Sequence, residues 1–189
     1  MSSERSAEYL YRTLTLEAFA DTIVPGEKRS PDDVAIAGAS PGPGAVAAGA
    51  IELLETPATG IADSLDIYAR DVNDRARAYA SGAGIDLDGS VPPFVALSFA
   101  DRIALVQELT APGNPEKDLW ILLVMFSNMA FDTAPHVHTT DAIAAGHPGL
   151  TAMGFAKPNA DGLWRFGDYS YGRQLARIHP GTTSSGSPA

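Results

Sequence analysis

"PEKDLWILLVMFSNMAF", residues 115–131, is the stretch of sequence that decides the fold. Every side chain from Leu119 to Phe126 is apolar, which predicts a helix surrounded by protein on nearly all sides. Asn114 precedes the stretch as a candidate N-cap, and Pro115 suits the first helical position. An apolar run this short cannot cross a bilayer, so we expect the central helix of a folded core.

The segments upstream of this helix also show a helical period. Ser98 followed three positions later by Asp101 resembles a capping box, which predicts a helix over 99–110. A further helix is predicted over 61–79, because its apolar residues are spaced by four, three, four and seven and its charged residues fill the other face. The apolar residues of that helix are Ile61, Leu65, Tyr68, Val72 and Tyr79.

Two more helices are predicted nearer the N-terminus. In "TLEAFADTIVPG", Thr15 is a candidate N-cap, and Pro25 with the glycine after it ends the segment. In "PGAVAAGAIELLE", Pro43 lies near the first turn of a helix that continues to residue 55. The stretch "EKRSPDDVAIAGASPGPG", residues 27–44, is rich in proline, glycine and charge, which is typical of a loop.

The fold class that follows is all-α. No segment shows the sustained alternation of a strand, and no internal repeat is present. We expect a single helical domain of about five helices over 14–180, ending in a long irregular C-terminal arm. Residues 1–13 are predicted to form an N-terminal extension and residues 181–189 a disordered tail.

Composition excludes several classes of function. The 189 residues carry a formal net charge of −10, which disfavours binding to nucleic acid. The absence of cysteine excludes disulfides, thiolate metal sites and cysteine nucleophiles. The first residues lack a signal peptide pattern and no segment is long and apolar enough for a membrane, so we expect a cytoplasmic protein without a membrane partner.

The loop "DTAPHVHTTDAIAAGHPG", residues 132–149, is the main candidate for chemistry. His136 and His138 could bind a metal together with Asp132, Asp141 or His147, because alternate residues of an extended stretch share a face. Alternatively, a carboxylate–histidine pair such as Asp141 with His138 could act in acid–base catalysis. The ordinary alternative is a connector between helices, in which these side chains only cap and pack.

The C-terminal arm carries a second candidate surface. "GLWRFGDYSYGRQLARI" alternates aromatic and polar residues, and aromatic and arginine side chains dominate the energetic centres of protein interfaces. The arm is therefore predicted either to bind a partner or to fold back over the helical core. The candidate partner-binding residues are Trp164, Phe166, Tyr169, Tyr171 and Arg173.

Three segments together resemble the gluconate 2-dehydrogenase subunit 3 family. "LTLEAFADTIVPG" is similar to the family's opening helix, "PGPGAVAAGAIELLE" to its next element, and "GHPGLTAMGF" to its late turn, with His147 where tyrosine is usual. The resemblance covers roughly residues 14–155, with the segments in the family's order. The matching residues are Ala20, Asp21, Ile23 and Pro25 in the first segment and Pro43, Gly44, Ala45, Ala48 and Gly49 in the second.

The resemblance implies a small helical subunit without chemistry of its own. Such subunits accompany a large flavin-dependent dehydrogenase of the glucose-methanol-choline type, assist its maturation, and export it through a twin-arginine signal. This chain departs from the family in lacking that signal and the paired tyrosines after the central helix, where it has "NMAFDTAPHVH". Export is therefore not expected, and a cytoplasmic stabilising role is.

Our leading hypothesis is a non-catalytic accessory subunit that binds no cofactor itself, with FAD in its partner. Contacts are expected from the proline- and glycine-rich loop 25–44, including Pro25 and Pro43, and from the arm 147–179, including His147. The alternative is a stand-alone enzyme, metal-assisted or cofactor-free, that uses His136, His138 and Asp141. A third possibility is a self-associating helical scaffold.

Overall fold

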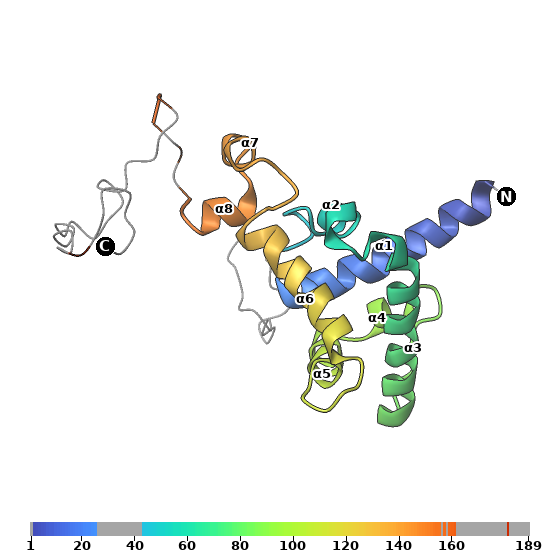
Figure 1. The fold of residues 1–189 in the computed structure, drawn as a ribbon. Helices are drawn as coiled ribbons and strands as arrows, with labels where there is room; N and C mark the ends of the chain where they lie inside the picture. Colours follow the sequence, from blue (N-terminus) through green and yellow to red (C-terminus); the bar gives the residue numbers. More distant parts are fainter. Residues whose placement is uncertain (1, 26–42, 156, 158, 162–180, 182–189) are drawn as a thin grey trace. The chain divides into compact units, whose positions relative to one another are not determined.

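The structure, a computed structural model, describes residues 2–25, 43–155, 157, 159–161 and 181. Its described residues form helices and no strand, which confirms the all-α prediction (Figure 1). The described residues contain eight α-helices where about five were expected. Their bounds are α1 Ser2–Ile23, α2 Ala50–Leu54, α3 Leu65–Ala83, α4 Pro93–Ala96, α5 Phe99–Leu109, α6 Lys117–Asp132, α7 Thr139–Ala144 and α8 Pro148–Ala152, with 3-10 helices at Pro57–Thr59 and Ala62–Ser64. The numbers differ because the three additional helices, α4, α7 and α8, are too short for a clear periodic signal.

The chain divides into two compact units, Met1–Ala156 and Lys157–Ala189. All eight helices belong to the first unit. Most of the second unit, which holds the predicted tail and all of the predicted arm from residue 157 onward, lies outside the described residues.

Helix α1 is longer than predicted, and it corrects two expectations. Residues 2–13 are helical and continuous with the rest of α1, so no boundary separates them from the helical domain. Thr15 is not an N-cap but an internal helical residue that is fully buried. Its hydroxyl does not cap the helix but donates a hydrogen bond to the backbone oxygen of Tyr11, one turn earlier in α1, at 2.9 Å.

A buried asparagine joins three helices in the core. The Nδ2 of Asn73 on α3 donates to Thr15 Oγ1 on α1 at 2.9 Å and to the Ala69 backbone oxygen at 2.9 Å. Its Oδ1 accepts from the backbone N–H of Phe94 at 3.1 Å, in the first turn of α4. Both polar ends of this buried amide are therefore satisfied, as burial requires.

The predictions for α3 and α5 are confirmed. On α3, Leu65, Tyr68 and Val72 are buried along the predicted apolar face. At the start of α5, the Ser98 side chain accepts a hydrogen bond from the Asp101 backbone N–H, as a capping box does.

Helix α6 occupies the central place predicted for residues 115–131. It packs against α1, α2, α5 and α8, and both Trp120 and Leu123 are fully buried. The helix begins two residues later than expected, and Asn114 instead accepts a hydrogen bond from the Glu116 backbone N–H at 2.9 Å. One of its faces is open to solvent, however, since Ile121 and Met125 are 38% and 40% exposed.

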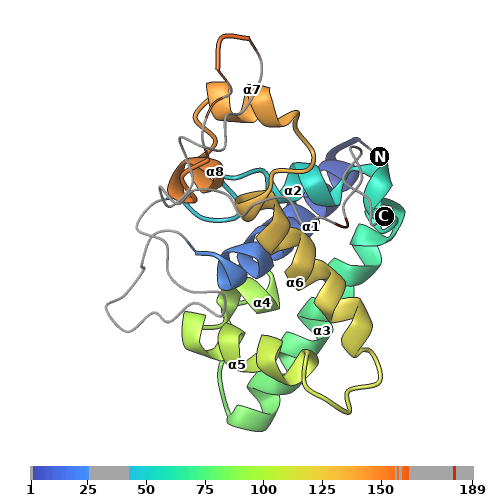
Figure 2. The same cartoon turned by 60° about the vertical axis from the view of Figure 1, so that its left-hand side comes forward.

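The short helices α7 and α8 lie beside the C-terminal end of α6 in both views of the fold (Figures 1 and 2). Helix α7 lies within the 132–149 segment, and α8 lies in the arm that was expected to be irregular. At the opposite end of α6, its N-terminus lies beside α5 (Figure 2). No described helix has the length and apolarity that spanning a membrane requires.

Candidate functional site

The segment Pro43–Gly49, called here the 43–49 turn, replaces the first half of the helix predicted to begin at Pro43. The Ala45 backbone N–H donates to the Val24 oxygen just after α1, at 2.7 Å. At the other end, Gly49 has a φ of +86°, a left-handed conformation that glycine adopts at little cost and that an α-helix does not contain. That residue delays the start of α2 to Ala50.

His147 connects this turn to the late part of the chain. Its Nε2 lies 2.9 Å from the backbone oxygen of Ala48, and its Nδ1 accepts from the Leu150 backbone N–H at 3.3 Å. Because Nδ1 is an acceptor, Nε2 carries the proton and donates to Ala48. His147 thus caps α8, with Pro148 at the first helical position, and holds a turn 99 residues earlier in the chain.

His136 lies against the same turn. A Cβ added to Gly49 would lie 2.4 Å from His136 Nε2, so the ring fits only because residue 49 has no side chain. The Nδ1 of His136 is buried and has no hydrogen-bond partner among the residues that the structure describes. Burial lowers the pKa of His136 below its ordinary value, nearby His147 lowers this pKa further, and Glu52 opposes both effects.

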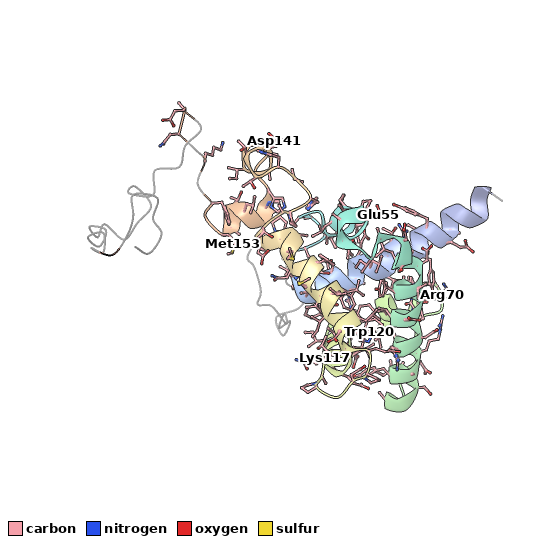
Figure 3. All side chains as sticks on the ribbon, viewed as in Figure 1. Glu55, Arg70, Lys117, Trp120, Asp141 and Met153 are labelled. Atoms are coloured by element: carbon pink, nitrogen blue, oxygen red, sulfur yellow. The ribbon has the colours of Figure 1, made fainter. Side chains whose placement is uncertain are left out.

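The other candidate ligands and catalytic residues lie apart from this pair. His138 is exposed just before α7. Asp141, which is labelled in Figure 3, is exposed in the first turn of that helix. Asp132, at the end of α6, accepts a hydrogen bond from Asn128 Nδ2 at 2.7 Å. Within the described part of the chain, no three histidine, aspartate or glutamate side chains are grouped so that they could hold a metal ion.

The predicted partner-binding residues have different surroundings. Pro25 is buried within this chain, Pro43 is exposed, and both ring nitrogens of His147 are used internally. The remaining candidates, Trp164, Phe166, Tyr169, Tyr171 and Arg173, lie outside the described residues.

Two features of the first unit were missed by sequence reasoning. Gly149 fits directly against the backbone of Phe131, which allows α8 to cross the end of α6. Between α1 and α3 lies an open groove of about 910 Å³, lined on the α1 side by Tyr9, Tyr11 and Arg12. The two tyrosines at 9 and 11, in the stretch expected to be an extension, were the available signal for this groove.

These features define an all-α domain in which segments distant in sequence meet at the backbone of the 43–49 turn. Val24, His136 and His147 all contact that backbone. The family model described as "Family of unknown function (DUF5987)" matches residues 10–189 of the chain, and the chain belongs to this family. Comparisons with curated proteins and with solved structures give no match.

Proposed function

We propose that this chain is a non-catalytic accessory subunit that stabilises a large flavin-dependent oxidoreductase of the glucose-methanol-choline type. In this proposal, the partner binds FAD and carries out the reaction, and the chain itself holds no cofactor. Its place of action is the cytoplasm. The proposal starts from the resemblance to the gluconate 2-dehydrogenase subunit 3 family.

The observation that carries the proposal is the spatial arrangement of the three segments that bear this resemblance. Near the end of the first segment, the Val24 oxygen accepts a hydrogen bond from the Ala45 backbone N–H in the second segment. The second segment in turn accepts, through Ala48, a hydrogen bond from His147 in the third. A shared fold requires its defining segments to contact one another, and the contacts at this turn are consistent with that requirement.

A stabilising role needs only a surface that binds the folded partner. Any group that binds the native state and not the unfolded chain adds to the stability of the partner by mass action. The proposed anchors are the exposed Pro43 in the first unit and the aromatic residues of the C-terminal arm, with Trp164, Phe166 and Arg173 as the residues to test. Aromatic and arginine side chains concentrate binding energy at interfaces of this kind.

Co-purification from the native host tests the proposal. The chain, tagged at its C-terminus, is expected to bring down a larger yellow protein whose absorbance and released cofactor identify FAD. A triple variant, Trp164→Ala with Phe166→Ala and Arg173→Ala, is expected to lose this protein. Thermal melting of the purified variant is the control, and it should match the unsubstituted chain.

Two outcomes contradict the proposal. One is capture of no flavoprotein by the unsubstituted chain under conditions where the host expresses it. The other is stoichiometric metal in the purified chain that disappears in His136→Ala and His138→Ala, together with turnover of a small substrate. That second outcome would support the alternative of a stand-alone enzyme.

A further inference from the structure

Residues 134–155, called here the 134–155 segment, begin at a strained backbone position. Ala134 has a φ of +45°, and in the described part of the chain it is the only residue other than glycine with a positive φ. Helices commonly end on a glycine in this left-handed conformation, because the Cβ of any other residue is crowded there. Ala134 is fully buried just after α6, so the packing around it must maintain the strain.

The 134–155 segment has a small core of its own. Ala134, Ala142 and Leu150 form a buried cluster, with Ile143 packed against it, and this cluster is separate from the main core of the described residues. Four apolar side chains bury little surface, so the segment depends on its contacts with the rest of the domain. Regions with few buried apolar contacts open locally at a lower cost in free energy than global unfolding.

Two histidines hold the segment against the 43–49 turn. The Nε2 of His147 donates to the backbone oxygen of Ala48 at 2.9 Å, and the ring of His136 lies against Gly49, the next residue of the turn. Helix α8 also packs on α6. The contact between the segment and the turn is therefore made by side chains that can take up a proton near neutral pH.

Both histidines fit these places as neutral imidazoles. The Nδ1 of His147 accepts from the Leu150 backbone N–H, and a proton on that nitrogen would replace the acceptor by a second donor. The Nδ1 of His136 is buried without a hydrogen-bond partner among the described residues, so a proton there would create a buried donor without an acceptor. In addition, a positive charge on His147 disfavours one on His136.

The carboxylates around the turn do not reverse this effect. Glu52 on α2 favours a proton on His136, but burial and His147 outweigh it, so the pKa of His136 is lowered. On α1, Glu17 lies near Glu52, and burial together with the neighbouring carboxylates raises the pKa of Glu17. Two further carboxylates lie on the neighbouring helices and apart from the two rings: Asp132 on α6 and Asp141 on α7.

We propose that the 134–155 segment separates from the 43–49 turn as one unit when His136 and His147 are protonated, while α1 to α6 keep their packing. Ala134 is the hinge, because its backbone can relax once the packing around it is released. Separation uncovers the turn and the end of α6. This device does not depend on the proposed function, because all of its contacts lie within this chain.

Native-state amide hydrogen exchange of the full chain, between pH 7.5 and 5.5, tests the proposal. Each exchange rate is divided by the intrinsic rate at that pH, which gives an opening constant. The reporters are three amides bonded within the segment: the backbone N–H groups of Thr151, Met153 and Phe155. We expect one common opening constant for them, at least about tenfold larger than that of the buried amides of α3 and insensitive to low urea. It should rise at least about fivefold from pH 7.5 to pH 5.5.

Variants separate protonation from packing. His147→Asn retains a side-chain oxygen that can cap α8, and His136→Gln retains a polar side chain, but neither residue titrates. The double variant should open more often than the unsubstituted chain, with an opening constant that is equal at the two pH values. His138→Gln, at an exposed site of the same segment, is the matched control and should leave the pH dependence intact. The α3 amides of each variant report whether the rest of the domain is folded.

Three results would overturn the proposal. The first is exchange of the reporter amides with the same opening constant as the α3 amides, which would show that the segment does not open separately. The second is an opening constant that does not change between pH 7.5 and 5.5 in the unsubstituted chain. The third is a pH dependence that persists in the double variant, because other groups would then control the opening.

Discussion

Gly149 and Phe131 approach so closely that a Cβ on residue 149 would lie 1.7 Å from the Phe131 backbone oxygen. The close approach is between two backbones, so no side-chain rotation can relieve it. The last turn of α6 and the first turn of α8 therefore tolerate no side chain at residue 149.

Gly149→Ala is expected to destabilise the fold by about 3 kcal/mol or more, because α8 must move away from α6. Gly82→Ala is the matched control: Gly82 is also helical, no atom lies within 4 Å of its added Cβ, and alanine favours helix by up to about 1 kcal/mol. Urea unfolding followed by circular dichroism measures both. Equal stabilities of the two variants would show that α8 does not pack as described.

Gly49→Ala is expected to destabilise the fold through two separable effects. The left-handed φ costs about 1–2 kcal/mol, and the clash with His136 adds to this cost. Gly113→Ala carries only the first effect, because Gly113 has a φ of +95° and open space around it. The difference between the two variants in chemical denaturation therefore measures the clash. Combining Gly49→Ala with His136→Ala should remove part of that difference, because the truncated residue 136 no longer clashes with the added Cβ. If the losses of unfolding free energy in the two single variants simply add up in the double variant, the contact between residues 49 and 136 is contradicted.

The stability of the fold should decrease on acidification through the lowered pKa of His136. Because the folded-state pKa lies below the unfolded value, the unfolded chain binds more protons as pH falls through the unfolded pKa near 6.5. Stability is then lost until the pH reaches the folded-state pKa, and it is constant for this group below that value.

His136→Gln should flatten this part of the pH profile, whereas His138→Gln, at an exposed site, should not. Unfolding free energies measured by urea titration between pH 5 and 8 make the comparison. If the unfolding free energy changes with pH equally steeply in the His136→Gln variant and in the unsubstituted chain, the assignment of this pH dependence to His136 is contradicted. His147 and Glu52, the titratable groups that act on His136, remain in place in both variants.

Asn73→Leu is expected to cost about 2–4 kcal/mol, because it leaves the Phe94 backbone N–H without its partner and removes the bond to Thr15. Thr15→Val should cost less, since it removes a single acceptor from the Asn73 amide. The double variant measures their coupling, and we expect a coupling energy of at least about 0.5 kcal/mol in thermal or urea unfolding. A coupling near zero would show that the two side chains do not interact.

The sequence predicted those helices whose signals are local. Helix α3 has a continuous apolar spacing, and α5 has a capping box within four residues, so both were predicted nearly as observed. Thr15 misled because a threonine before an apolar run has the same local pattern as a cap, and only its distant partner Asn73 distinguishes the two. The helix expected at Pro43 failed because Gly49 has a left-handed backbone, which a single glycine in sequence does not reveal.

The candidate site was harder to predict for the same physical reason. The histidines attracted attention as a group, but their roles are set by contacts with a turn about 90 to 100 residues earlier, where His136 packs on Gly49 and His147 binds Ala48. No local pattern encodes such pairings. The groove between α1 and α3 is likewise lined by residues from two separate helices.

The hydrogen bond from His147 to Ala48 has a consequence for synthesis of the chain on the ribosome. When the 43–49 turn leaves the exit tunnel, His147 has not yet been translated. About a hundred further codons must be read before the His147 side chain emerges and can bind Ala48. Until then the nascent polypeptide lacks the hydrogen bond that joins the 43–49 turn to the late part of the domain. The domain can therefore complete its folding only after residues 136–152 have been synthesised. Slow codons in that interval prolong the time during which the incompletely folded chain exposes apolar surface.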